Sequence, residues 1–133
     1  MCENNNCNCY YDTLKLIVNL QRQDSCLNQD SSCTRPFLGG NSTTSYNTRP
    51  ITFYSCCNNT IWTMPYTLNG TTGTSSVFRC EAVEGCCATC RVLAPNPDAT
   101  STLPYVATNN YFTMNLEKVG CISCLDDTYV ACI

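Results

Sequence analysis

The sequence FRCEAVEGCCATCRVL, residues 78–93, combines a strand pattern with four cysteines. Over residues 77–84 bulky or apolar residues alternate with charged ones, as a strand with one solvent-facing side requires. Gly85 can adopt the positive φ that a tight turn needs. Residues 88–93 then form a second run that leads back. The stretch therefore predicts a β-hairpin in which sulfur chemistry helps to hold the sheet.

Further short strands are predicted on both sides of this hairpin. They are rich in β-branched and aromatic residues and are separated by Gly, Asn and Pro, which favour turns. Residues 56–59, which include Cys56 and Cys57, are predicted to be a turn, and residues 69–74 a loop. A count of six to eight strands predicts a mainly β fold, a small disulfide-rich antiparallel β-sandwich or barrel. The predicted strands are residues 51–55, one or two within 60–68, 103–107 and 111–117, and residues 120–125 are predicted to be a last strand or a turn.

One helix is predicted before the strands, over residues 10–23. Apolar or long side chains recur there at i, i+3, i+4 and i+7, and a second apolar flank predicts contacts on two sides of the helix. We expect two parts, an N-terminal cysteine-rich arm and helix (residues 1–34) and a β domain (residues 35–133). The first flank consists of Leu14, Ile17, Val18 and Gln21, and the second of Leu16 and Leu20.

Composition argues against several classes of partner. The 133 residues carry a formal net charge of −3, with 13% charged residues and a sequence pI near 4.6, so no basic surface for phosphates is expected and nucleic acid is not predicted as a partner. The longest apolar run, residues 14–20, is short and interrupted, which predicts no membrane insertion. The first residues show no secretory signal pattern.

The absence of histidine removes most enzyme mechanisms. Neither a Ser-His nor a Cys-His nucleophile can be built, nor a metal site that depends on histidine. The acidic pairs, Glu81 with Glu84 and Asp126 with Asp127, are interpreted as solvated surface charges. We predict no catalytic residue, no cofactor and no metal ligand, and therefore a protein that is not an enzyme.

Two C-x2-C pairs support a different hypothesis. Cys87 with Cys90, and Cys121 with Cys124, have the spacing of zinc-ribbon ligands. The alternative reading is therefore a zinc-stabilised intracellular binding domain that uses these four thiolates. A third possibility is a secreted, disulfide-rich adhesin or effector, which the missing signal pattern disfavours.

The number of cysteines exceeds what one domain of this size needs for folding. Fourteen cysteines are more than a tenth of the chain, a level typical of disulfide scaffolds, while 133 residues can bury a core without staples. We therefore predict that some cysteines join chains, particularly those near the ends. The predicted disulfide residues, within or between chains, are Cys2, Cys7, Cys9, Cys26, Cys33, Cys56, Cys57, Cys80, Cys86, Cys87, Cys90, Cys121, Cys124 and Cys132.

Several blocks, taken in order, resemble a known family. Together they cover well over half of the chain, and the chain is similar on them to the CotY/CotZ/ExsY group of cysteine-rich spore coat and exosporium proteins of spore-forming Firmicutes. The blocks are residues 9–23, 36–39 (PFLG), 47–50 (NTRP), 77–83 (VFRCEAV), 87–93 (CATCRVL) and 121–125 (CISCL).

The resemblance implies a structural protein of the spore surface, in the outer coat or crust or in the exosporium basal layer. It implies self-assembly into a two-dimensional, often hexagonal lattice that intermolecular disulfides stabilise. The implied partners are other copies of the chain and other spore coat or exosporium proteins. The resemblance also implies synthesis in the mother-cell cytoplasm without a signal peptide, followed by oxidation when the mother cell lyses.

Overall fold

The structure of the protein, a computed structural model, describes residues 8–29, 46–131 and 133, and the side chains of these residues except 23–29. One helix precedes seven strands, and a short 3₁₀ helix follows β6. The elements are α1 (Asn8–Gln29), β1 (Ile51–Ser55), β2 (Met64–Leu68), β3 (Thr71–Ser75), β4 (Phe78–Glu84), β5 (Cys87–Pro95), β6 (Tyr105–Asn115), η1 (Leu116–Lys118) and β7 (Val119–Cys124).

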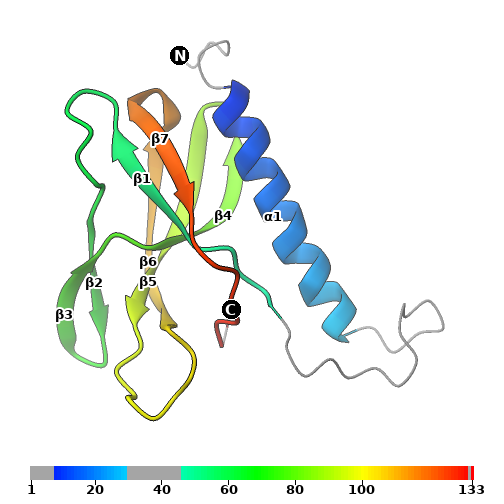
Figure 1. Ribbon diagram of the computed structural model, residues 1–133, viewed down its shortest axis with the longest axis vertical. Helices are drawn as coiled ribbons and strands as arrows, with labels where there is room; N and C mark the ends of the chain where they lie inside the picture. Colours follow the sequence, from blue (N-terminus) through cyan, green and yellow to red (C-terminus); the bar gives the residue numbers. More distant parts are fainter. Residues whose placement is uncertain (1–7, 30–45, 132) are drawn as a thin grey trace.

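The strands form two antiparallel sheets. Five strands pair in the order β6-β5-β4-β1-β7, and β2 and β3 form a separate two-stranded ribbon that packs on β5 and β6. The helix and the ribbon lie at opposite sides of the molecule (Figure 1). The prediction of a mainly β, antiparallel fold with one N-terminal helix is therefore confirmed.

The five-stranded sheet is joined in the middle by a very short pairing. β1 and β4 share one pair of register partners, Ile51 and Phe78, and both side chains are fully buried. Beyond this point the two strands diverge (Figure 1). Aromatic rings fill the space that opens: Phe78 lies 5.9 Å from Phe53 and 4.8 Å from Phe112, measured between ring centroids. Ring pairs at such distances add to the stability that burial supplies.

The helix covers this core with one face only. Leu14, Ile17 and Val18 are buried in the same apolar cluster as the strands, as the spacing predicts. Leu16 and Leu20 are 57% and 40% exposed, so the second flank has no comparable contact within the described part of the chain. A stripe at i, i+3, i+4 and i+7 covers about one side of a helix, and residues two positions away from it face outward.

A buried glutamine links the helix to the strands. The Gln21 side chain is 4% exposed. Its Nε2 donates to the carbonyl oxygen of Cys80 at 2.9 Å, and its Oε1 accepts from the Arg49 backbone N–H at 3.0 Å. Gln21 therefore satisfies one backbone acceptor and one backbone donor where α1 crosses β4 and the segment that leads into β1.

The helix is longer than predicted. It runs from Asn8 to Gln29, whereas the periodic pattern covers only residues 10–23. Residues 24–29 contain neither Gly nor Pro, and these are the residues that usually stop a helix. The periodic apolar residues mark only the segment of the helix that packs on the sheet. They do not show whether the helix continues beyond that segment.

Two strand predictions were wrong in detail. Residues 71–75 form β3 directly after the turn at Asn69 and Gly70, where φ is 52° and 81°, whereas residues 69–74 were predicted to be a loop. Two left-handed residues are typical of a tight hairpin turn, and threonine suits the strand that follows. Residues 105–115 form one strand where two were predicted. Asn110 stays within β6 because its side-chain oxygen accepts from the Thr67 backbone N–H at 2.9 Å.

The acidic residue Glu81 is not the solvated surface charge that the sequence suggested. It lies between two arginines, with Oε1 2.6 Å from Arg79 Nη1 and Oε2 3.3 Å from Arg91 Nε. Arg79 is 5% exposed and also donates to the Thr48 hydroxyl at 2.9 Å. Asp127 is likewise held by Arg49, at 2.7 Å, and this hydrogen bond is the main reason that the Asp127 pKa is lowered.

Gly120 allows β7 to approach the end of β1 closely. A Cβ atom at this position would lie 2.9 Å from the Ser55 carbonyl oxygen and 3.0 Å from Cys56 Cα. Both are backbone atoms, so the contact cannot be relieved by a side-chain rotation. The backbone N–H of Cys56 also donates to the Lys118 carbonyl at 2.9 Å, which holds the turn after β1 against the start of β7.

We predict that Gln21→Leu lowers the free energy of unfolding by roughly 2–4 kcal/mol, because it leaves a buried N–H and a buried C=O unsatisfied. Asn19→Leu, at an exposed position of the same helix, is the control and should change stability little. Urea denaturation of both variants measures the difference. Equal stabilities of the two variants would show that the Gln21 hydrogen bonds contribute nothing.

We predict that Gly120→Ala destabilises the protein by about 1–3 kcal/mol, because the added methyl group overlaps backbone atoms that are held in place. Ser123→Ala, at an exposed position of the same strand, is the matched control and should be close to neutral. Thermal and urea unfolding of the reduced proteins measure both effects. A Gly120→Ala variant as stable as the control would contradict the close approach.

Candidate functional site

The chemistry of this chain lies in its thiols, and the structure describes nine of the cysteines. Eight of them are free thiols, namely Cys9, Cys56, Cys57, Cys80, Cys87, Cys90, Cys121 and Cys124. The ninth, Cys86, is buried and disulfide-bonded. The predicted disulfide residues Cys2, Cys7, Cys33 and Cys132 lie outside the described residues, as does the side chain of Cys26.

Two adjacent cysteines form the turn after β1. Cys56 and Cys57 are exposed, and their sulfur atoms lie 3.1 Å apart. The pKa of Cys56 is raised, first by its hydrogen bond with Cys57. The turn position agrees with the prediction for residues 56–59. Both sulfurs are open to solvent and to any molecule that docks against this turn.

Two further exposed cysteines lie around the phenol of Tyr10. Cys9 precedes Tyr10 in the first turns of α1, and Cys121 follows Gly120 on β7. The Tyr10 hydroxyl donates to the Gly120 carbonyl at 2.8 Å, which ties the start of the helix to β7. Partial burial raises the Tyr10 pKa, and the charges of Cys9, Cys121 and Cys56 raise it further. All three sulfurs are therefore close enough to Tyr10 to act on it electrostatically.

A fifth exposed cysteine belongs to the same end of the molecule. Cys87 begins β5, next to the turn where Gly85 has a φ of 60°. The short helix η1 connects this turn with the Cys56 turn: the Leu116 N–H donates to the Cys86 carbonyl at 2.8 Å, and the Lys118 carbonyl accepts from Cys56. Figure 1 shows the start of α1, the end of β1, the β4–β5 turn and the start of β7 at one end of the molecule.

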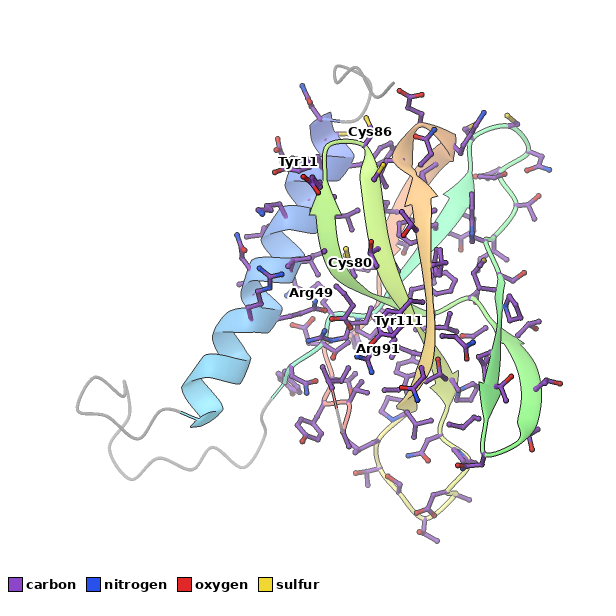
Figure 2. All side chains as sticks on the ribbon, turned by 180° about the vertical axis from the view of Figure 1, so that it is seen from behind. Tyr11, Arg49, Cys80, Cys86, Arg91 and Tyr111 are labelled. Carbon is purple, nitrogen blue, oxygen red and sulfur yellow. The ribbon has the colours of Figure 1, made fainter. Side chains whose placement is uncertain are left out.

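We call this region the thiol end and define it by Cys9, Cys56, Cys57, Cys87 and Cys121. Five exposed thiols come from four separate parts of the chain and gather at one end of the fold. Figure 2 shows Cys86 at the tip of the hairpin, close to the first turns of α1 that carry Tyr11.

The remaining free thiols lie elsewhere. Cys124 ends β7 opposite Ile51 and is exposed. The hydrogen bond with Asp127 is the main cause that raises the pKa of Arg49, and the charge of Cys124 adds to it. Cys80 and Cys90 are buried in the core. The described cysteines therefore fall into an exposed group, mostly at the thiol end, and a buried group inside the sheet.

The proposed zinc ligands do not converge. Each C-x2-C pair lies within a strand, where residues three apart point to opposite faces, and Cys87 is indeed exposed while Cys90 is buried. β4 and β1 separate β5 from β7 in the sheet. Among the described residues no group of three or more potential ligands is placed to hold a metal ion. A zinc site built from Cys87, Cys90, Cys121 and Cys124 is therefore not favoured.

Sequence reasoning missed the residues that assemble the thiol end. Tyr10, Gly120 and the η1 segment were not singled out, although they connect α1, β1, β5 and β7. One sequence feature could have indicated this arrangement, namely the position of Gly120 directly before a cysteine in a predicted strand. An isolated glycine in a strand often marks a place where another backbone segment approaches closely.

The two edge strands of the main sheet carry none of the residues that usually oppose pairing with another strand, although the β2–β3 ribbon packs on β6. β6 and β7 are the outermost strands, and neither contains a charged residue or proline. Natural edge strands commonly carry such residues because exposed N–H and C=O groups otherwise pair with another strand. β7 also carries two exposed cysteines, Cys121 and Cys124.

No helix in the described part of the chain combines the length and apolar character that crossing a bilayer requires. No curated protein and no solved structure gives a significant match to the chain. A family model described as spore coat protein Z matches residues 2–130, which confirms the resemblance found in the sequence. The chain therefore belongs to the spore coat protein Z family, and this membership supports a structural role at the spore surface.

Proposed function

We propose that the protein is a building block that self-assembles into an ordered layer at the spore surface and that disulfides between chains then lock this layer. The observation that carries the proposal is the thiol end, where five exposed thiols gather at one end of a packed β fold. A rigid body that presents several thiols on one side can crosslink to neighbours in a defined geometry.

No strand cysteine of the thiol end faces another cysteine in register, although Cys9, Cys56 and Cys121 all lie around Tyr10. Cys56 and Cys57 are adjacent, and neighbouring Cα atoms lie about 3.8 Å apart, below the range of about 4.4–6.8 Å that disulfides prefer. Cys121 faces Tyr54 across the β1–β7 pair. Cys87 faces Glu84 on one side and Asn115 on the other. The arrangement therefore favours bonds to another copy of the chain.

The uncharged edge strands support ordered contacts before any covalent bond forms. Backbone groups along β6 and β7 can pair with a strand of a neighbouring copy. The low net charge of −3 gives little long-range repulsion between copies. Non-covalent docking sets the register of the copies, and oxidation of the thiol end then makes it permanent.

The same scheme accounts for the thiol-rich composition in a protein made inside a cell. The thiols stay reduced in the mother-cell cytoplasm and oxidise once that cell lyses around the spore. The proposed role is structural and calls for no catalytic residue. The layer belongs to the outer coat or crust, or to the exosporium, where other coat proteins are its partners.

We predict that replacing all five thiol-end cysteines with serine leaves a folded protein that no longer forms reducible multimers. Surface substitutions of this kind change stability little. Air-oxidised wild type should give a ladder of covalent species on a non-reducing detergent gel, which a thiol reductant collapses to monomer. The five-serine variant should run as monomer under both conditions, and circular dichroism should show an unchanged fold.

The matched control is Cys124→Ser, which removes an exposed thiol outside the thiol end and should keep the ladder. A second variant has serine at Cys2, Cys7 and Cys132, which the sequence suggests as crosslinking positions near the chain ends. An oxidised ladder from the five-serine variant equal to that of wild type would contradict the role assigned to the thiol end.

A further inference from the structure

Two cysteines outside the thiol end lie directly opposite each other in the core. Cys80 on β4 and Cys90 on β5 are register partners. Both are free thiols, and both are 0% exposed. Figure 2 shows Cys80 well inside the strand, away from the turn that carries Cys86. Another copy of the folded chain cannot reach either sulfur.

The backbone at this pair already meets the requirement for a disulfide. Facing residues of antiparallel strands have Cα atoms about 4.5–5.5 Å apart, within the range of about 4.4–6.8 Å for disulfide-bonded cysteines. Cross-strand neighbours also point to the same face of the sheet. The electrostatics agree with this proximity, because each thiol is the largest single influence on the pKa of the other.

Among the cysteines whose side chains the structure describes, each of the two sulfurs has only the other as a register partner. Cys90 faces Phe112 on its other side, and the Phe112 ring packs edge-on against Phe78. Cys86 and Cys87 belong to the same hairpin but lie at its turn, at the far end of β4. The sheet register is regular at Cys80 and shifts only beyond it, before Ala82.

The two thiols also differ in acidity. The hydrogen bond from Cys90 is the main cause that lowers the pKa of Cys80, and the Cys80 sulfur also contacts the Ala82 carbonyl at 3.6 Å. The same bond between the thiols, followed by burial, raises the pKa of Cys90 well above its ordinary value. Because the thiolate is the nucleophile in thiol–disulfide exchange, Cys80 is the first of the two to react.

We propose that Cys80 and Cys90 form an intrachain disulfide that staples β4 to β5 when the protein is oxidised by a small-molecule disulfide. The Cys80 sulfur attacks one sulfur of the oxidant and expels a thiol. The Cys90 sulfur then attacks the Cys80 sulfur and expels the second thiol. The protein loses two protons and two electrons, and the oxidant gains them as two thiols. The step stands independently of self-assembly.

Burial separates this bond in time from the reactions of the thiol end. An oxidant reaches the pair only when the hairpin opens locally, whereas the exposed thiols react in the folded protein. The staple therefore forms during folding in an oxidising buffer, or slowly in the native state. It closes a short loop within one hairpin and stiffens the strands on which the thiol end is built.

The test is peptide mapping of the full-length chain, refolded from denaturant at low concentration in a glutathione redox buffer. Equal amounts of ¹⁵N-labelled and unlabelled protein are mixed before refolding, so that bonds between chains give peptides of mixed isotope content. Cleavage after Glu84 and Arg91 without reduction places Cys80 and Cys90 on different peptides. We expect a Cys80–Cys90 linked species, assigned by fragmentation, whose two halves carry the same isotope.

The proposal would be overturned if both residues were recovered as free thiols, or if either one were bonded to a different cysteine. It would also be overturned if the two linked peptides carried different isotopes, because the bond would then join two chains. Thermal unfolding gives a second measurement. Oxidation should raise the Tm of wild type and of the control variant Cys124→Ala, which changes an exposed thiol. In the Cys90→Ala variant the rise in Tm on oxidation should be smaller by roughly 5–10 °C. Equal oxidation-induced rises in the two variants would also overturn it.

Discussion

The bridge between Ile51 and Phe78 is the constraint on which the rest of the structure depends. It is the single register pair that joins β1 and β7 to the β4–β5–β6 meander. The Phe78 ring contacts Phe53 on one side of this junction and Phe112 on the other. Because β1 and β4 diverge from the bridge, their far ends and the start of the helix can all carry cysteines at one end of the molecule. Packing at the apolar junction therefore determines where the reactive groups lie.

The same packing sorts the thiols into two chemical environments. Thiols at the thiol end are exposed, and the two that lie on strands, Cys87 and Cys121, face residues other than cysteine. These are the thiols that we propose to join neighbouring copies. Cys80 and Cys90 face each other inside the core, so oxidation directs them toward one another. If both proposals hold, one change in redox conditions gives the protein an internal staple and external crosslinks.

Local patterns in the sequence predicted the elements well and their pairing poorly. The hairpin at residues 78–93 and its turn at Gly85 follow from alternation and from one glycine, and the buried face of α1 follows from its spacing. Register is a long-range property: no local pattern shows that Cys80 faces Cys90, or that Cys87 and Cys121 lie on non-adjacent strands. For that reason the sequence supported a zinc hypothesis that the described residues do not favour. The division between residues 34 and 35 falls in the part of the chain that the structure does not describe, and it stays a prediction.

Negative-stain electron microscopy of the purified, oxidised full-length protein, with and without prior boiling in detergent, can show whether the protein forms a disulfide-locked layer. We expect ordered sheets, rings or tubes that survive boiling and disperse when a thiol reductant is added with the detergent. Uniform monomers that are indifferent to reductant would contradict a disulfide-locked assembly. Such a result would leave the spore coat protein Z fold in place, and it would remove the function proposed for its thiol end.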